Sequence, residues 1–320
     1  AVDGVSLAVE EGETVGIVGE SGCGKSTLAR SVMGTLPDEG QIKAGEIRFR
    51  GTDLTALSPR ERREYMWEEI SLIPQSAMNG LDPVYTIRDQ IVEAIETHRP
   101  TTSDAEANQT VEEMFEIVGL APERADDYPH QFSGGMRQRA MIAMALALDP
   151  GLILADEPTT ALDVIMQDQI FKYFDEVKDK IDTSLLLITH DISVIFESCD
   201  KVAIMHAGQV AETGDVVDVH QNPRHPYTIL FKEAFPDIRY PNRELEIIEG
   251  YPPQHIGDVD YCSFVDRCPW ATEECREGAP TLEQAEEKDH RAACFRMDET
   301  ARLYEQEYES RLAEAVGQED

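Results

Sequence analysis

Short apolar runs alternate along the chain with longer segments whose apolar residues follow a helical period. The runs at residues 14–18, 70–73, 152–155, 185–188 and 201–205 are nearly uninterrupted by charge. Such runs are typical of parallel strands that are covered on both faces. Helical patterns lie at 87–96, 111–118, 136–148 and 164–180. The alternation of strands and helices predicts an α/β fold built on a mostly parallel sheet.

The same pattern divides the chain into parts. Residues 1–220 form the predicted core, and a mainly helical stretch at about 80–150 is inserted into it. Beyond residue 220 prolines punctuate a loop-rich region, so residues 221–320 are predicted to be a C-terminal extension that ends in a charged surface helix at 299–316.

A glycine-rich segment stands where the first predicted strand turns into a helix. Its sequence from residue 19 to residue 26 is Gly-Glu-Ser-Gly-Cys-Gly-Lys-Ser. The glycines let backbone N–H groups curl around phosphate oxygens, and the helix start adds partial positive charge. Lys25 is expected to reach the β- and γ-phosphates, and the Ser26 hydroxyl to bind Mg²⁺. The predicted nucleotide-binding residues are Gly19, Ser21, Gly22, Gly24, Lys25, Ser26 and Thr27.

Two later strands deliver polar side chains to one sheet edge. Asp156 and Glu157 follow the apolar run at 152–155, and His190 follows the run at 185–188. Ligands of open parallel sheets gather at the carboxyl ends of the strands. Asp156 is expected to hold the metal through water, and Glu157 to orient the water that attacks the γ-phosphate.

A second anion-ready helix start distinguishes the chain from kinases and small GTPases. Ser133, Gly134 and Gly135 open the helical run at 136–148 without supplying a lysine. With these three segments in this order, residues 1 to about 230 resemble the ATP-binding cassette family. The resemblance implies a P-loop NTPase core whose mostly parallel sheet has an antiparallel part. It also implies that the serine-glycine-glycine helix of one subunit closes over ATP held by its partner.

The resemblance assigns further roles to single residues. It implies that Gln75 contacts Mg²⁺ and the attacking water, so the expected Mg²⁺ ligands are Ser26, Gln75 and Asp156. It implies that Asp163 links the two sites of the dimer and that His190 senses the γ-phosphate. The adenine-stacking residue of the family lies upstream of the phosphate loop. Because the sequence starts inside the cassette, a preceding segment is expected to carry it.

Residues 222–228 narrow the resemblance to ATP-binding subunits of oligopeptide and dipeptide importers, which share such a C-terminal extension. The implied function is an ATP-hydrolysing subunit of a peptide importer. Its expected partners are a second ATPase, identical or related, two transmembrane permease subunits and, indirectly, an extracellular substrate-binding protein. The alternatives are an importer of oligosaccharides or metal complexes, or a cassette ATPase that acts on nucleic acid or ribosomes.

The charge balance bears on these alternatives. The sequence has 63 acidic and 28 basic side chains, a formal net charge of −35. Such a surface repels nucleic acid and anionic lipid, which argues against a nucleic-acid partner and against direct lipid docking. No run approaches a membrane span or a signal peptide. The expected location is the cytoplasmic face of the membrane, through permease contacts, and the acidic surface suggests adaptation to a salt-rich, halophilic cytoplasm.

Four cysteines crowd into the extension at Cys262, Cys268, Cys275 and Cys294. In a reducing cytosol a metal is more plausible for them than paired disulfides, and thiolates suit Zn²⁺ or an iron–sulfur cluster. Related peptide-importer ATPases carry a similar pattern and some hold a four-iron four-sulfur cluster. The resemblance therefore implies a 4Fe–4S cluster, with zinc as the alternative. His255 and His290 are nearby substitutes as ligands.

Overall fold

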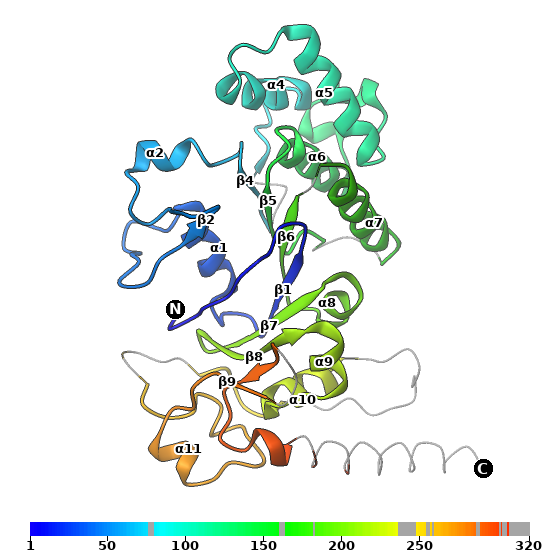
Figure 1. Cartoon of the computed structure of the whole chain (residues 1–320). Helices are drawn as coiled ribbons and strands as arrows, with labels where there is room; N and C mark the ends of the chain where they lie inside the picture. The colour runs from blue at the N-terminus through cyan, green and yellow to red at the C-terminus, as the bar shows by residue number, and fades with distance from the viewer. Residues whose placement is uncertain are drawn as a thin grey trace, which may run out of the picture. The chain divides into compact units, whose positions relative to one another are not determined.

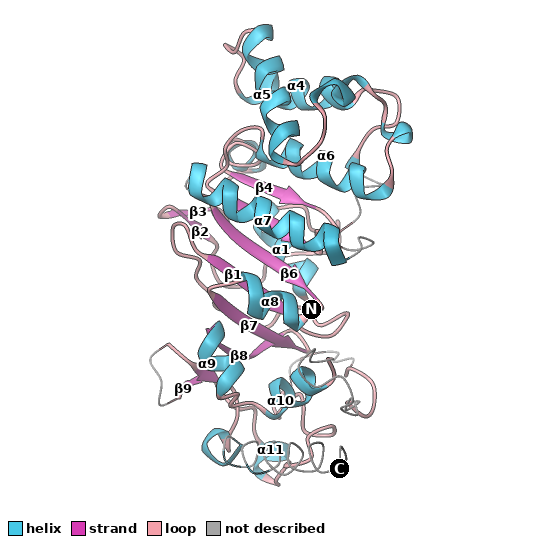
Figure 2. Cartoon of the chain, turned by 90° about the vertical axis from the view of Figure 1, so that its right-hand side faces the viewer, coloured by secondary structure: helices cyan, strands magenta, loops and turns pink. Residues whose placement is uncertain are grey.

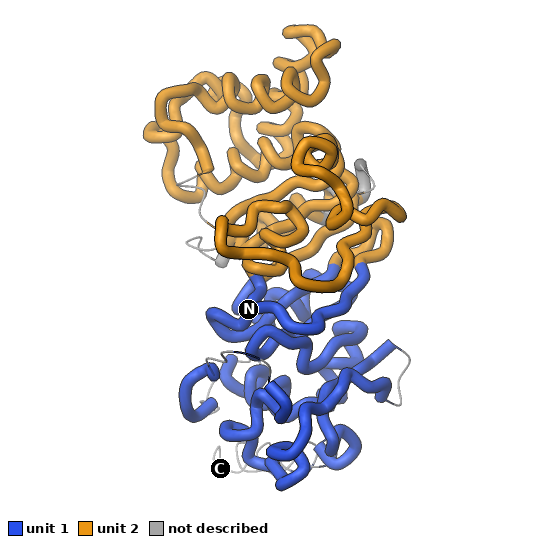
Figure 3. Tube along the Cα trace, turned by 90° about the vertical axis from the view of Figure 1, so that its left-hand side faces the viewer, with its two compact units in different colours: residues 1–8, 15–25, 189–320 blue, residues 9–14, 26–188 orange. Residues whose placement is uncertain are grey.

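The computed structural model describes most of the chain (Figure 1; Figure 2 colours it by secondary structure). The described residues are 1–75, 80–159, 164–181, 183–235, 248–253, 257, 259–285, 289–300, 302 and 306. They divide into two compact units, shown in Figure 3. Unit 1 comprises residues 1–8, 15–25 and 189–320, and unit 2 comprises residues 9–14 and 26–188.

Unit 2 contains three parallel strands, β4 (Ile70–Ile73), β5 (Leu152–Asp156) and β6 (Ser184–Thr189), with β5 in the middle. The last residue of β6, Thr189, is counted with unit 1. All six residues of β6 are buried, as are the last four of β5. Burial on both faces explains why these strands read as apolar runs rather than as alternating patterns. The prediction of buried parallel strands is confirmed.

Three helices of unit 2 form most of the inserted stretch predicted at about 80–150. Helices α4 (Ile87–His98), α5 (Asp104–Ile117) and α6 (Gly134–Leu146) contact one another, and α6 also packs on β4 (Figure 1). Helix α5 begins seven residues before the predicted 111, because the Ser103 side chain caps it and Glu106 completes the capping box. The unit also contains α1 (Lys25–Met33) from Ser26 onward, which follows the phosphate loop. Its other elements are α2 (Pro59–Arg63), α7 (Val164–Ile181), the hairpin of β2 (Arg48–Phe49) and β3 (Thr52–Asp53), and the short 3₁₀ turns Pro122–Asp126 and Pro129–Gln131.

In unit 1 the strand β7 (Lys201–His206) is central. It pairs in parallel with β1 (Thr14–Val18), of which residues 15–18 belong to this unit, and antiparallel with β8 (Gln209–Asp215). The predicted antiparallel part of the sheet is therefore present. β10 (Arg291–Ala292) extends it by pairing with β8, and β9 (Glu283–Gln284) pairs with β10. Two strands from beyond residue 220 thus join strands from before it.

Helices cover this sheet and lead into the C-terminal residues. Helix α9 (Val216–Gln221) packs on β7, β8 and α8 (Ile192–Ser198), and α10 (Pro226–Glu233) packs on β8. Helix α11 (Glu274–Glu277) is a single turn. The predicted helix at 299–316 lies largely outside the described residues. Within the part that is described, no helix is both long and apolar enough to traverse a lipid bilayer.

Candidate nucleotide site

The phosphate loop connects β1 to α1, as the sequence predicts. Gly22 and Gly24 have φ angles of 83° and 110°, a region that L side chains rarely adopt. A Cβ on Gly19 would stand 2.1 Å from the Met205 carbonyl oxygen, so this position accepts only glycine. The backbone can therefore curl tightly enough to direct its N–H groups at an anion.

Lys25 is buried and folds back over the same loop. Its Nζ donates to the carbonyl oxygens of Gly19 at 2.6 Å and of Glu20 at 3.0 Å. These bonds hold the ammonium group at the loop, where a phosphate-binding lysine is expected.

Two of the three predicted Mg²⁺ ligands meet in unit 2. Ser26 Oγ donates to Asp156 Oδ1 at 3.1 Å, and Asp156 is 8% exposed at the carboxyl end of β5. A hydroxyl and a carboxylate oxygen side by side are the donors that Mg²⁺ prefers. The residues present therefore fit the predicted metal.

Gln75 and Glu157 form a second pair in the same unit. Gln75 Nε2 donates to Glu157 Oε2 at 3.0 Å. Glu157 has a φ of 50°, and its backbone N–H donates to the Ile188 carbonyl of β6 at 2.8 Å. A non-glycine residue held in the left-handed region is a strained position of the kind found at functional sites. In this conformation the Glu157 carboxylate lies within hydrogen-bond distance of the Gln75 amide.

Ser133 caps α6 through its side chain, which accepts the Met136 N–H at 3.3 Å. Ser133 and Gly134 are exposed, and a Cβ on Gly134 would meet nothing within 4 Å. This helix start is open to another molecule. His190 is exposed directly after β6 and belongs to unit 1, whereas Asp163 lies outside the described residues.

Sequence reasoning missed how Glu20 of the phosphate loop is held. Both carboxylate oxygens of Glu20 accept from the Arg267 guanidinium at 2.7 Å, and its backbone N–H donates to the Tyr227 hydroxyl at 3.0 Å. The sequence did contain one indication, because an acidic residue in an anion-binding loop must be neutralised by a nearby cation. Nothing in the sequence pointed to Arg267 as that cation.

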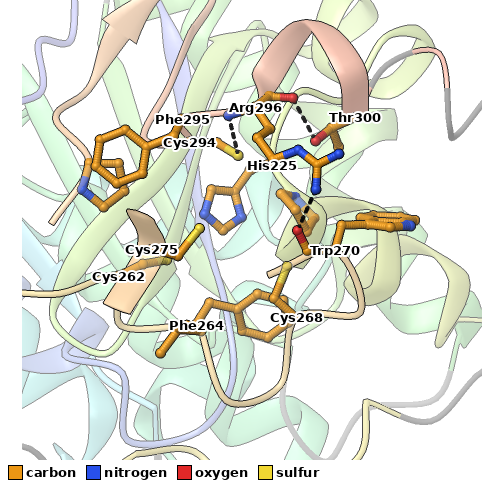
Figure 4. A pocket seen from close by; sticks show the side chains of 13 residues that line it. His225, Cys262, Phe264, Cys268, Trp270, Cys275, Cys294, Phe295, Arg296 and Thr300 are labelled. Atoms are coloured by element: carbon orange, nitrogen blue, oxygen red, sulfur yellow. Dashed lines mark hydrogen bonds between the residues drawn. The ribbon is translucent and has the colours of Figure 1, made fainter. Parts of the chain in front are cut away.

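The four cysteines of the extension line one cavity, together with His225 and Phe264 (Figure 4). Burial raises the pKa of Cys262 to about 11 and that of Cys268 to about 12. Among the residues that the structure describes, however, no three His, Cys, Asp or Glu side chains are grouped so that they could hold a metal ion. The donor chemistry suits a thiophilic metal, but the arrangement of the thiols does not confirm the predicted cluster at Cys262, Cys268, Cys275 and Cys294.

The predicted substitute ligands do not change this result. His290 is fully buried and its Nε2 pairs with Glu212 at 2.7 Å, a contact that explains its burial without a metal. His255 lies outside the described residues.

Two family models match the chain. The model described as ABC transporter matches residues 2–160, and the model described as oligopeptide/dipeptide transporter, C-terminal region, matches residues 211–275. Both matches agree with the resemblance drawn from the motifs.

Curated relatives match over nearly the whole length. A "probable peptide ABC transporter ATP-binding protein" of Sinorhizobium fredii is 44% identical over 95% of this chain and 91% of its own. The "dipeptide transport ATP-binding protein DppD" of Escherichia coli is 40% identical over 94% of this chain and 93% of its own. A solved dimeric structure of the ATP-binding cassette MJ0796 in a post-hydrolysis state, bound to ADP and Pi, has a TM-score of 0.61. The two chains are 27% identical, and the alignment covers 67% of this chain and 90% of the MJ0796 chain.

Proposed function

Because the chain belongs to the family of ABC transporter ATP-binding proteins, we propose that it is the ATP-binding and ATP-hydrolysing subunit of an importer of dipeptides or oligopeptides. The observation that carries the proposal is the match of both family models, the cassette at residues 2–160 and the peptide-transporter region at 211–275. Relatives at 40–44% identity named for peptide or dipeptide transport support the cargo.

ATP would be held by the phosphate loop. The loop backbone and Lys25 would bind the β- and γ-phosphates, while Ser26, Gln75 and Asp156 would hold Mg²⁺, Asp156 through water. The support is the fold of Lys25 over the loop and the 3.1 Å contact between Ser26 and Asp156. Mg²⁺ bound there would neutralise charge on the phosphates.

Hydrolysis would depend on Glu157. Its carboxylate accepts a proton from, and orients, the water that attacks the γ-phosphate, and Gln75, which donates to that carboxylate, positions it. His190, exposed at the end of β6, is proposed to sense the γ-phosphate.

The test is the Glu157→Gln variant of the full chain. We expect kcat to fall by at least about 100-fold, because general base catalysis contributes that much, while the affinity for Mg-ATP is retained. Lys25→Ala is the matched control, since it should lose binding as well. Turnover of Glu157→Gln at the wild-type rate would refute the assignment of the base.

The second half of each ATP site would come from a partner ATPase. Ser133, Gly134 and Gly135 of one subunit would close over the γ-phosphate held by the other, with Asp163 linking the two sites. The support is the exposed start of α6, which offers backbone N–H groups and a helix dipole to an anion. The partner is either an identical chain or a related ATPase.

Two permease subunits and an extracellular binding protein would complete the importer at the cytoplasmic face of the membrane. Reconstitution of the whole complex in proteoliposomes tests the cargo. We expect ATP-dependent uptake of a radiolabelled dipeptide that Lys25→Ala abolishes. Uptake of an oligosaccharide or a metal complex instead of peptides would overturn the assigned cargo and leave the ATPase assignment standing.

We propose that the cysteine cavity of the C-terminal extension, residues 221–320, takes up a thiophilic metal centre, an iron–sulfur cluster in preference to zinc. The support is that Cys262, Cys268, Cys275 and Cys294 face one cavity in a chain with six cysteines. Anaerobic purification followed by iron, sulfide and zinc analysis tests it. The expected result is bound iron and sulfide with visible absorption. Stoichiometric zinc would instead support a zinc site and refute the iron–sulfur cluster, and absence of metal would refute both.

Adaptation to a salt-rich cytoplasm is the remaining proposal, supported by the net charge of −35. Salt screens repulsion among surface carboxylates. The melting temperature is therefore expected to rise steeply between about 0.1 M and 1 M KCl, where the Debye length falls from about 10 Å to 3 Å. A melting temperature that is independent of KCl would contradict it.

A further inference from the structure

Glu20 is an unfavourable residue for its position. It is the only acidic residue between Gly19 and Ser26, the segment proposed to bind the triphosphate of ATP. A carboxylate this close to bound phosphates repels them, most strongly where protein excludes water. The loop therefore needs a compensating cation in addition to Lys25.

Arg267 supplies that cation from the C-terminal residues. Its two terminal nitrogens each donate to a different oxygen of the Glu20 carboxylate, both at 2.7 Å. The side chain of Arg267 is 7% exposed and that of Glu20 is 19% exposed. A bidentate, shielded pair of this kind is among the stronger polar contacts in proteins.

The Arg267 side chain is itself fixed in place. Its Nε donates to the Glu249 carbonyl oxygen at 3.0 Å, and its guanidinium stands 5.7 Å from the centre of the Phe264 ring. Phe264 is 1% exposed and meets the Tyr227 ring edge to face at 5.4 Å. The turn between Cys262 and Cys268, which carries both Phe264 and Arg267, therefore presents the guanidinium in one orientation.

Tyr227 reinforces the same link through the backbone. Its hydroxyl accepts the Glu20 N–H at 3.0 Å, while Lys25 donates to the Glu20 carbonyl oxygen. The side chain, N–H and carbonyl of Glu20 are thus all engaged. Two of these three partners, Tyr227 and Arg267, lie beyond residue 220.

We propose that Arg267 is a positioning residue for ATP binding, which neutralises Glu20 and holds the phosphate loop. The C-terminal extension thereby sets the affinity of the cassette for Mg-ATP. This inference rests on the proposed binding of ATP by that loop.

The experiment compares variants of the full chain by titration with a fluorescent ATP analogue and by steady-state hydrolysis. Arg267→Gln is expected to raise both the Kd and the KM for Mg-ATP about tenfold, with kcat changed less than about twofold, since an unpaired shielded charge is left at the binding loop. Arg267→Lys, which keeps the charge, is expected to retain most of the affinity.

Neutralising the acid separates an electrostatic role from a merely structural one. Glu20→Gln alone is not expected to weaken binding, and Glu20→Gln combined with Arg267→Gln is expected to restore the affinity to within about threefold of wild type. Arg276→Gln is the matched control, because it removes an exposed arginine of the same extension that pairs with Asp266. It should leave the Kd unchanged.

Three results would overturn the inference. Unchanged affinity in Arg267→Gln removes the positioning role, and a double variant as weak as Arg267→Gln shows that Arg267 acts only by holding the fold. In either case the proposed function stands if the wild type binds Mg-ATP and Lys25→Ala does not. A wild-type chain that binds no Mg-ATP overturns both.

Discussion

Replacing Glu212 is expected to lower stability strongly, because this fully buried carboxylate accepts hydrogen bonds from three donors. Its Oε1 accepts from the Arg224 N–H and from His290 Nε2, each at 2.7 Å, and its Oε2 accepts from the His225 N–H at 2.8 Å. These bonds tie β8 to the start of α10 and to the residue before β10.

Replacing Glu212 by Ala leaves three buried donors without that acceptor. Each buried unsatisfied donor costs about 1–3 kcal/mol, so the sum is roughly 3–9 kcal/mol before relaxation. Because water can enter the space left by the side chain, we expect a loss near the lower end, about 4 kcal/mol of unfolding free energy. Glu212→Gln should lose about 2 kcal/mol, since its NH₂ group must face one of the donors.

Urea denaturation followed by Trp270 fluorescence measures this loss. The chain has two tryptophans, and a Trp67→Phe background leaves Trp270, in unit 1, as the reporter. Glu283→Ala, which removes an exposed glutamate of β9, is the matched control and should change stability by less than about 0.5 kcal/mol. If Glu212→Ala costs less than about 1 kcal/mol, the reasoning from unsatisfied buried donors is wrong.

Other expected outcomes follow from single sites. Burial lowers the pKa of His225 to about 3. Below about pH 6.5 this histidine is therefore protonated in the unfolded state but stays neutral in the folded state. Stability is therefore expected to fall by about 1.4 kcal/mol per pH unit from pH 6.5 towards 3. His225 Nδ1 accepts the Tyr227 N–H at 3.0 Å and so caps α10, and in His225→Asn the amide oxygen can take over this cap. The variant should flatten the pH dependence of urea midpoints measured between pH 7.5 and 5, whereas identical slopes in the two proteins would contradict this. Gly19→Ala should abolish ATP binding in an equilibrium titration, because its Cβ would stand 2.1 Å from the Met205 carbonyl oxygen, and normal binding would show that the loop adopts another conformation. Since desolvation raises the pKa of the half-buried Cys262 to about 11, iodoacetamide should alkylate this thiol in metal-free protein at pH 8 at least about tenfold more slowly than free cysteine. Mass spectrometry measures the rate, and equal rates would refute the raised pKa.

The parts of the fold that local pattern determines were predictable. The run at 14–18 is β1, and the run at 152–155 is β5 extended by Asp156, because a strand buried on both faces has no polar interruption. Helix starts were displaced where a cap decides them. Helix α6 begins at Gly134 rather than at 136 because Ser133 caps it, and the capping oxygen carries no apolar signal.

Contacts between distant residues could not be predicted. Glu20 and Arg267 are 247 positions apart, and Glu212 and His290 are 78 apart. In the sequence each of these residues is an ordinary charged or polar position. A hydropathy pattern describes only residues close together along the chain, so it cannot reveal such pairs. The predicted Mg²⁺ ligands Ser26 and Asp156 were recoverable because each belongs to a motif whose position relative to a strand or helix is fixed.

We propose that each ATP is held by the phosphate loop of one subunit and covered by the Ser133 helix of another. A cryo-electron microscopy structure of the whole importer carrying Glu157→Gln, with Mg-ATP, tests it most directly. The account predicts a triphosphate in contact with Lys25 of one cassette and with Ser133 and Gly135 of the facing cassette. A fully occupied complex in which Ser133 lies away from the neighbouring triphosphate would contradict it.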